Sequence, residues 1–206
     1  CLMEILGNPQ EQLHCIHVAG TNGKGSVCAF LAAMLESAGY RVGKYISPNL
    51  IRVNERITIN GEEIAEGALN ALLSRMEKAS DEVKRRIGEN PSQFEIWTAA
   101  AFCYFAEKSC DYVVLETGLG GEFDATNVIS GNVMAVLTHI DLDHMQYLGN
   151  TVQQIAETKS KIIKKKCETG VVISSPQKPE AMAVLKERAA ECSLRLIVPE
   201  EALVIG

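Results

Sequence analysis

The chain has 206 residues, of which 47% are hydrophobic and 22% charged, and its formal net charge at pH 7 is −6. This length allows one sizeable domain, or one domain and part of another, with an ordinary apolar core. The negative charge argues against a nucleic-acid partner, which favours a basic surface. No apolar run approaches the roughly 18 residues of a membrane span, and the first ten residues lack the pattern of a signal peptide.

The cysteines show no pairing pattern. Their number is odd, and no C-x-x-C pair occurs. We therefore expect reduced thiols in a cytoplasmic protein, most of them filling the core as small apolar side chains. The seven positions are Cys1, Cys15, Cys28, Cys103, Cys110, Cys167 and Cys192.

The first elements are predicted to be a strand, a glycine-rich loop, a helix and a second strand. The apolar run "LHCIHV" (13–18) is typical of a buried strand and leads directly into the loop. From Ser26 to Ala38 apolar residues recur at helical spacing, and Gly39 then favours an end to the helix. The stretch "RVGKYIS" (41–47) predicts the second strand.

The region that follows is less regular. We expect a loop over 48–56 and a short strand with a turn, "ITING", over 57–61. Residues 62–79 predict an amphipathic helix, because their apolar positions recur at helical spacing. The polar run 80–91 predicts a mobile or exposed segment.

A buried helix and two buried strands are predicted next. Ser92 and Glu95 form the S-x-x-E pattern of a capping box. The helix after it, 94–107, is apolar on nearly every side, which implies full burial. The runs 111–116 and 132–140 lack polar alternation, as expected for central strands of a parallel sheet covered on both faces.

The last third continues the alternation of strands and helices. Thr151 and Gln154 predict a second capping box, before a helix that we expect to reach about Lys165. A strand, a helix and a strand are predicted over 170–175, 179–192 and 194–199. The chain is therefore predicted to have an α/β fold, with a mostly parallel sheet flanked by helices.

The loop "HVAGTNGKGS" (17–26) suggests a phosphate site. The usual phosphate loop reads G-x-x-x-x-G-K-[ST], but here Val18 replaces the first glycine and Ser26 comes two residues after Lys24. A strand before the loop and a helix after it provide the context in which backbone N–H groups and the helix dipole bind phosphate. Lys24 would add a positive charge, and Ser26 a ligand for Mg²⁺ or for phosphate. The alternative is a tight turn that needs glycine for backbone freedom.

Glu116 ends a predicted central strand, beyond which ligands bind in open α/β sheets. Acidic residues at this place hold Mg²⁺ in other phosphate-loop proteins. Gly118, Gly120 and Gly121 follow it and would let the backbone pass close to a ligand. The alternative is a carboxylate that only accepts hydrogen bonds from the glycine turn.

A third polar group follows the strand 132–140. Asp141, Asp143 and His144 are clustered there, and His144 could ligate a metal ion through a ring nitrogen, although a lone histidine is more often structural. The loops after residues 18, 116 and 140 would converge at one sheet edge and share a site.

Other polar residues receive simpler interpretations. His14 and His17 are expected to occupy strand or strand-edge positions without a role in the chemistry. The run "KIIKKK" (161–166) predicts a solvated helix end, where lysines interact favourably with the helix dipole.

Five stretches between about Leu6 and Lys165 stand out together: "HVAGTNGKGS", "ISPNLIRVNERITING", "FEIWTAAAFCYFAE", "VVLETGLGGEFDATNV" and "THIDLDHMQYLGNTVQQIAETKSKIIK". In order and spacing they resemble the motifs of the folylpolyglutamate synthase and dihydrofolate synthase family, which belongs to the Mur ligase superfamily of ATP-dependent amide-forming ligases. The short loop form G-T-N-G-K-G-S is the family's own variant. The weaker tail, 166–206, fits the rest of the same ATPase domain.

The resemblance implies a set of site residues. The implied ATP-binding residues are Thr21, Asn22, Gly23, Lys24, Gly25 and Ser26. The implied Mg²⁺ ligands are Ser26, Ser47, Glu116 and His144. The implied catalytic residues are Lys24, His144 and Lys159, the last as a carbamylated lysine that supports the metal ion. The implied folate contacts are Arg52, Arg56, Gln93 and Phe94.

The resemblance also implies a phosphate-loop NTPase-like fold, that of the Mur ligase central domain, and a two-step reaction. A folate or dihydropteroate carboxylate attacks the γ-phosphate of ATP, and the amine of L-glutamate then displaces phosphate to form an amide. ATP, L-glutamate and the pterin compound are the expected small-molecule partners of a cytoplasmic monomer. No membrane or nucleic-acid partner is expected, nor a covalent protein nucleophile.

The sequence departs from the family pattern at several positions. Asn49 stands where the family has His, Glu122 replaces Arg after "GLGG", and Asp141 replaces Gly before "LDH". The family's E-K-A-G around the special lysine is Thr158-Lys159-Ser160-Lys161 here. These changes bear on the folate contacts and on the carbamylation of Lys159, whereas the ATP loop matches without change.

Three alternatives follow from these departures and from the loop. One is another Mur-type ligase acting on a peptidoglycan precursor, against which the folate-like stretch "ISPNLIRVNERI" argues. Another is a non-catalytic ATP-binding paralogue, and the third is a plain phosphate-loop ATPase or kinase. ADP release without any amine acceptor would favour the third.

The chain begins at Cys1 without Met and stops at Gly206 inside the apolar run "ALVIG". We therefore expect residues 1–206 to be an ATP-binding domain incomplete at both ends, without the C-terminal domain that completes the glutamate site. Such a fragment is expected to bind nucleotide weakly and to turn over poorly or not at all.

Overall fold

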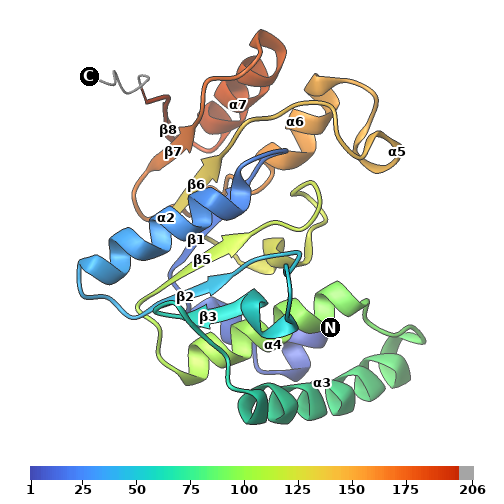
Figure 1. The fold of residues 1–206 in the computed structure, drawn as a ribbon. Helices are drawn as coiled ribbons and strands as arrows, with labels where there is room; N and C mark the ends of the chain where they lie inside the picture. Colours follow the sequence, from blue (N-terminus) through green and yellow to red (C-terminus); the bar gives the residue numbers. More distant parts are fainter. Residues whose placement is uncertain (200–206) are drawn as a thin grey trace.

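A computed structural model describes residues 1–199, so the predicted features of 200–206 lie outside the described residues. Within the described part, eight strands form one sheet in the order β4-β3-β2-β5-β1-β6-β7-β8 (Figure 1). The strands are β1 (Cys15–Ala19), β2 (Val42–Tyr45), β3 (Ile57–Ile59), β4 (Glu62–Glu63), β5 (Tyr112–Glu116), β6 (Met134–Leu137), β7 (Val171–Ser174) and β8 (Arg195–Ile197). All pairs along β2-β5-β1-β6-β7-β8 are parallel, and the pairs β2-β3 and β3-β4 are antiparallel. This confirms the predicted α/β fold with a mostly parallel sheet.

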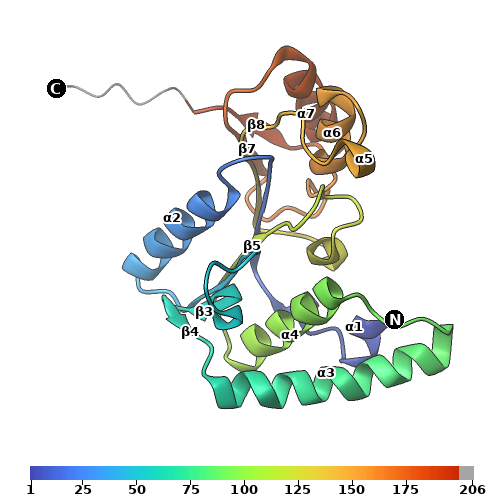
Figure 2. The same ribbon diagram turned by 45° about the vertical axis from the view of Figure 1, so that its right-hand side comes forward.

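Helices cover both faces of the sheet (Figure 2). The α-helices are α1 (Leu2–Ile5), α2 (Lys24–Ser37), α3 (Glu66–Ile87), α4 (Gln93–Glu107), α5 (Met145–Leu148), α6 (Val152–Ser160) and α7 (Pro179–Glu191). Short 3₁₀ helices are η1 (Pro9–Gln12), η2 (Val53–Arg56) and η3 (Ala125–Val128). Helix α2 lies alone on one face, while α4 with α3, and α6 with α7, lie on the other.

The two faces of β1 separate the core into different clusters. Ile16 and Val18 pack with Cys28 and Ala32 of α2. On the other face, Cys15 belongs to the cluster around α4, and Ala19 belongs to the cluster around α6 and α7. This alternation follows from the two-residue period of a strand, and it makes β1 a fully buried central strand.

Five of the seven thiols are buried, as expected for core residues, and all seven are free. Their burial raises the pKa of the Cys15, Cys28, Cys103 and Cys110 thiols, which keeps these groups neutral. Among the described residues, no helix is long and apolar enough to cross a membrane.

Both predicted caps are present, one of them in altered form. Ser92 Oγ accepts from the N–H of Glu95 at 3.2 Å, and Glu95 Oε2 accepts from the N–H of Ser92 at 2.7 Å. Thr151 Oγ1 likewise accepts from the N–H of Gln154, but Gln154 Oε1 accepts from Asn150 instead of the capping residue. Helix α4 is buried along most of its length, as its apolar composition predicted.

The structure corrects three predicted elements. Residues 62–63 form strand β4 rather than the start of the helix, because Asn60 and Gly61 take positive φ angles and turn the chain back onto β3. Helix α6 ends at Ser160, so "KIIKKK" (161–166) follows the helix, and Ile162 and Ile163 are fully buried. The loop predicted over 48–56 contains η2.

The prediction of a mobile or exposed segment over the polar run 80–91 is wrong for the first part of that run. Helix α3 continues to Ile87, where Gly88 ends it in a left-handed conformation. The buried positions Leu72, Met76, Ala79 and Val83 continue one helical stripe through the boundary. Val83, the one buried side chain in the polar run, is thus enough to extend the packed face.

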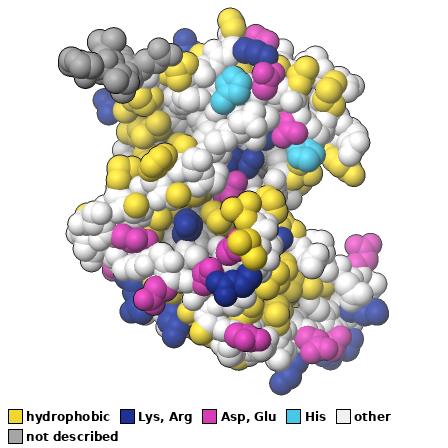
Figure 3. Space-filling view, viewed as in Figure 1, with side chains coloured by type: hydrophobic (Ala, Val, Ile, Leu, Met, Phe, Trp, Pro, Cys, Tyr) yellow, Lys and Arg dark blue, Asp and Glu magenta, His cyan; other side chains and the backbone are white. Residues whose placement is uncertain are grey.

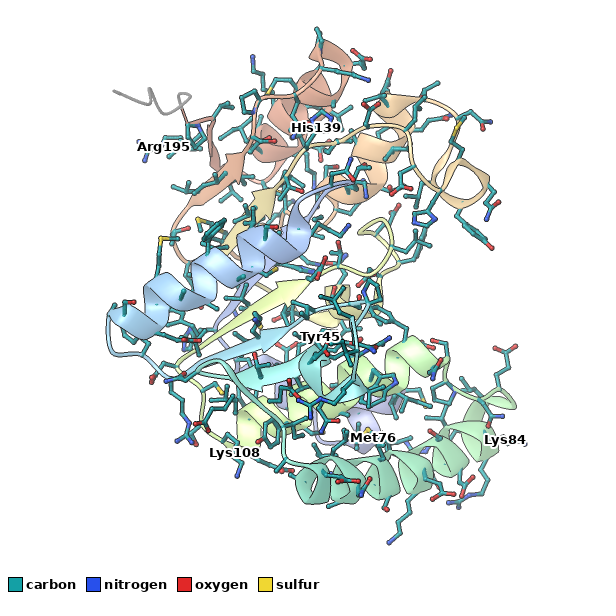
Figure 4. The ribbon with its side chains drawn as sticks, in the orientation of Figure 1. Tyr45, Met76, Lys84, Lys108, His139 and Arg195 are labelled. Atoms are coloured by element: carbon teal, nitrogen blue, oxygen red, sulfur yellow. The ribbon has the colours of Figure 1, made fainter. Side chains whose placement is uncertain are left out.

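This packing predicts unequal effects of two neighbouring substitutions. Val83→Asp should lower the free energy of unfolding by about 3 kcal/mol or more, because it buries an unpaired carboxylate. Lys84 is exposed near the end of α3 (Figure 4), so Lys84→Asp should cost about 1 kcal/mol or less, through the helix dipole. Urea denaturation of both variants measures the difference, and equal effects would show that residues 80–87 do not pack as a helix.

Candidate active site at the carboxyl edge of the sheet

The phosphate-like loop joins the end of β1 to the start of α2. Gly23 adopts a left-handed conformation (φ +83°) and precedes the first helical residue, Lys24. The loop lies against the end of β6, because a Cβ on Gly20 would come within 1.8 Å of Thr138 Oγ1. The N–H of Thr21 donates to His139 O at 2.8 Å, a residue that Figure 4 labels beside this loop. Glycine is thus required here by close approach as well as by the turn.

The Lys24 side chain folds back over the loop. Its ammonium group donates to Gly20 O at 3.1 Å and to Thr21 O at 3.3 Å. Lys24 is only partly buried, and Asn22, Gly23 and Ser26 are exposed. The loop therefore presents an ammonium group and the first turn of a helix at an accessible surface, which is an arrangement that attracts anions.

Glu116 lies at the end of β5 beside this loop. Oε2 accepts from the N–H of Ser47 at 3.2 Å, and a Cβ on Gly25 would lie 3.7 Å from the same oxygen. Burial raises the pKa of the Glu116 carboxyl, while the Ser47 N–H and the charge of Lys24 oppose this effect. The alternative interpretation of Glu116, a carboxylate that accepts hydrogen bonds from the glycine turn, is therefore wrong, because its donor is the N–H of Ser47.

The loop after β6 completes the edge. Thr21 Oγ1 donates to Asp141 O at 3.0 Å and lies 3.1 Å from the N–H of Asp141. The Asp141 carboxylate points away to Lys178, whose Nζ lies 2.6 Å from Oδ1. His144 begins α5 with a left-handed backbone (φ 45°), and its half-exposed ring lies 3.6 Å from Asp143 Oδ1. The expected convergence of the three loops is thus present.

Lys159 of α6 reaches the same loop from the other side. Its side chain is buried, and Nζ donates to Gly20 O at 2.8 Å. Burial, together with the charge of Lys24, lowers the Lys159 pKa to about 8, against the opposing effect of Asp143 and Asp124. The side chains of Lys24 and Lys159 therefore share one carbonyl oxygen, and the pKa of Lys159 is lowered as a result of its burial there.

A cleft of about 810 Å³ adjoins this edge, and Figure 3 shows the corresponding hollow on the right of the molecule. One wall is the loop 118–125, which packs closely against α4 and α6. A Cβ on Gly118 would lie 2.5 Å from the Phe94 ring, and a Cβ on Gly121 would lie 2.7 Å from Thr158 O. Phe123 and Tyr147 line the cleft and are 92% and 70% exposed.

The predicted folate contacts are not all in this cleft. Arg56 and Phe94 line it, with Phe94 packed near Tyr45, which lies between β2 and α4 (Figure 4). Arg56 also donates to Asn49 Oδ1 at 2.8 Å. Arg52 instead pairs with Glu63 beside a separate cavity, and exposed Gln93 is not among the cleft residues.

The predicted metal ligands supply few charged groups. Among the described residues, no three or more His, Cys, Asp or Glu side chains are grouped closely enough to hold a metal ion. The predicted set offers one buried carboxylate and one exposed imidazole beside two hydroxyls, from Glu116, His144, Ser26 and Ser47. The metal site therefore stays a prediction.

The sequence interpretation missed a buried polar group behind the cleft wall. Asp124 accepts from the N–H groups of Leu119 and Thr126, and His17 contacts the Thr126 hydroxyl. The predicted strand position of His17 is confirmed, and the structure adds its contact with Thr126. The signal available in the sequence was the pattern D-x-T, in which an aspartate caps the residue two places on.

Comparison with known proteins identifies similar sequences and structures. Residues 18–198 match the model of the Mur ligase middle domain. The chain is 44% identical over 189 residues to the dihydrofolate synthase/folylpolyglutamate synthase of Bacillus subtilis, covering 91% of this chain and 43% of that protein. It is 39% identical over 207 residues to the dihydrofolate synthetase of Saccharomyces cerevisiae, covering 98% and 47%. The chain thus spans less than half the length of these relatives.

Solved structures agree in fold. The apo form of L. casei FPGS superposes with a TM-score of 0.90 at 39% identity, covering 96% of this chain and 47% of that one. Mycobacterium tuberculosis folylpolyglutamate synthase complexed with ADP and AMPPCP gives a TM-score of 0.90 at 35% identity, covering 97% and 46%. A further match, an FPGS-AMPPCP-folate complex, has a TM-score of 0.90 at 39% identity, covering 96% and 47%.

The lowered pKa of Lys159 predicts a pH dependence of stability. Between pH 8 and the ordinary lysine value of 10.5, the unfolded chain binds a proton at Lys159 that the folded chain does not, so stability should rise with pH over this window. Lys159→Met removes this effect. The unfolding free energy of the wild type, relative to that of the variant, should increase by about 3 kcal/mol from pH 8 to 10.5. Urea titrations at several pH values measure it, and parallel pH profiles would contradict the assignment.

Proposed function

The chain belongs to the Mur ligase family, and from this premise we propose that it is the ATP-binding part of an ATP-dependent carboxylate–amine ligase. The observation that carries the proposal is the meeting of the phosphate-like loop, Glu116 and an aromatic-lined cleft at one sheet edge. The proposed reaction adds L-glutamate to the carboxylate of a folate or dihydropteroate. The names of the relatives support this choice of substrates.

ATP would bind at the loop between β1 and α2. Thr21 to Ser26 would surround the triphosphate, with the backbone N–H groups of Gly23 to Ser26 as donors because those of Thr21 and Asn22 already donate to His139 O. The Lys24 ammonium group would exchange its loop carbonyls for phosphate oxygens. This exchange needs only rotation of a flexible side chain, since Gly20 O keeps its hydrogen bond from Lys159. The positive charges would stabilise the transferring phosphoryl group.

The oxygen-rich edge also suits Mg²⁺. This ion prefers hard oxygen ligands, and the buried Glu116 carboxylate has the Ser47 N–H as its hydrogen-bond donor. Glu116, Ser26 and Ser47 would hold the ion, with His144 as a further ligand. When bound, Mg²⁺ would neutralise charge on the phosphates.

The reaction itself would proceed in two displacements. An acceptor carboxylate oxygen attacks the γ-phosphorus, the bond to the β–γ bridging oxygen breaks, and ADP leaves. The glutamate amine then attacks the acyl carbon, phosphate leaves and the amine nitrogen loses a proton. No bond to a protein side chain is formed, so the protein acts by positioning and by electrostatic stabilisation.

The cleft would hold the acceptor. Exposed aromatic rings at Phe123 and Tyr147, with Phe94 at its base, suit a flat heterocycle. The Arg56 guanidinium at the rim would attract the carboxylates of a folate tail. These features favour a pterin compound as the acceptor.

Lys159 would act as a carbamate. Its neutral amine would attack CO₂ and lose a proton, giving an anionic carbamate whose N–H could keep the hydrogen bond to Gly20 O. A pKa near 8 leaves part of the lysine neutral at physiological pH, which this reaction requires. The product would supply oxygen ligands beside the proposed metal site.

The ligase proposal is tested on the complete gene product that contains this chain. ADP release is followed with Mg-ATP and L-glutamate, adding dihydropteroate or tetrahydrofolate in turn. We expect release that requires both glutamate and a pterin acceptor, and a loss of about 100-fold or more in Lys24→Ala. Lys186→Ala, an exposed lysine on α7, serves as the matched control and should keep full activity. ATP binding without acceptor-dependent release would instead support a non-catalytic paralogue.

The carbamate proposal has a separate spectroscopic test. The complete protein, incubated with ¹³C-bicarbonate, should give a carbamate carbon signal that is absent in Lys159→Arg. The guanidinium of arginine stays protonated and cannot add CO₂, while it retains the positive charge. An equal signal in both proteins would place the carbamate elsewhere, and no signal in the wild type would leave Lys159 as an ammonium donor.

A further inference from the structure

A chain of hydrogen bonds joins the central strand to the wall of the cleft. His17 is fully buried in the middle of β1, and its Nε2 lies 2.8 Å from Thr126 Oγ1. Thr126 Oγ1 in turn lies 2.5 Å from Asp124 Oδ1. All three side chains are at least 94% buried, and Asp124 lines the cleft.

The direction of these bonds follows from the acceptors. The Asp124 carboxylate accepts from the N–H of Thr126 on Oδ1 and from the N–H of Leu119 on Oδ2. The Thr126 hydroxyl therefore donates its single proton to Asp124, and its oxygen accepts from His17. This requires the proton of the imidazole on Nε2. Burial lowers the His17 pKa to about 3, so the ring stays neutral in this tautomer.

Burying this network lowers the stability of the folded chain, which suggests that the network has a functional role. His17 Nδ1 is buried and has no hydrogen-bond partner among residues 1–199, although a purely apolar side chain at this position would avoid that penalty. A histidine here gives the strand a long donor that reaches across the packed layer to η3. The residues in register with His17 on the neighbouring strands, Leu115 of β5 and Ala135 of β6, are both hydrophobic.

Both ends of the network lead to proposed substrate sites. Three residues after His17, the chain enters the phosphate-like loop at Gly20. At the other end, Asp124 ties together the cleft wall, which the glycines at 118 and 121 allow to pack against Phe94 and α6. The network His17–Thr126–Asp124 thus joins the strand that leads into the phosphate-like loop to the wall of the cleft.

We propose that His17 and Thr126 are positioning residues, which hold Asp124 and the 118–126 wall of the cleft in a fixed place relative to the phosphate loop. The inference rests on the proposed function, since it assigns the cleft to the acceptor. Neither residue touches the reacting atoms. Their effect is on where the acceptor lies, and a displacement of the wall by a fraction of an ångström is enough to change its binding.

The test replaces Thr126 in the complete gene product. Thr126→Val keeps the shape but removes the hydroxyl, so that the His17 N–H loses its partner and Asp124 Oδ1 keeps only the backbone N–H of residue 126. We expect binding of tetrahydrofolate or dihydropteroate, measured by equilibrium titration, to weaken about tenfold or more, while ATP binding changes less than about twofold. Thr126→Ser restores the hydroxyl and should restore acceptor binding. Thr169→Val, which removes an exposed hydroxyl at the opposite edge of the sheet, should change neither.

The outcomes separate this inference from the ligase proposal. Weakened acceptor binding with unchanged ATP binding and rescue by serine supports positioning. Equal loss of both ligands in Thr126→Val, or no loss of either, overturns it. If the wild type binds the acceptor without releasing ADP, the ligase proposal fails and the same titrations still decide the inference. If the wild type binds no acceptor at all, both fail.

Discussion

The parallel pairing of β1 with both β5 and β6 is the constraint on which the site depends. Val18 is in register with Glu116, and Ala19 is in register with Leu137, so the three strands end at nearly the same level. Their following loops are therefore brought to one edge regardless of distance along the chain. Thr21 and Asp141 consequently meet through two hydrogen bonds although 120 positions separate them. Topology creates the site, and the local sequence only decides which groups occupy it.

This convergence also sets the electrostatics of the edge. Lys24 and Lys159 arrive from different helices and donate to the same carbonyl oxygen, that of Gly20. The second ammonium group is buried, so its charge is stabilised less by solvent and its pKa falls. An anion bound at the loop would favour both charged forms, whereas a carbamate on Lys159 would convert one cation into an anion. Nucleotide binding and modification of Lys159 are thus expected to be coupled through a single backbone oxygen.

How far the sequence predicts this arrangement depends on the range of the interactions. The cap at Ser92 and the turn at Gly23 are local, so their residue patterns identified them correctly. The extension of α3 depends on the burial of Val83 by elements distant in sequence, and the polarity of its neighbours concealed this. The strand position of His17 was predicted correctly, but its hydrogen-bond partner was not, for the same reason. A histidine in an apolar strand carries no local sign that a threonine 109 positions later will accept its hydrogen bond.

Geometry also distinguishes among the departures from the family pattern. At residue 141 the backbone groups bind Thr21, while the carboxylate turns outward to Lys178 at the start of α7. That ion pair is partly exposed and is worth little, so the loop position rests on backbone contacts that any residue could supply. Asp141 is therefore compatible with an intact nucleotide site. Glu122 differs, because its exposed side chain lines the same cleft as Arg56. A reversed charge there would act on a ligand bound in the cleft, which makes residue 122 the departure that bears on the proposed choice of acceptor.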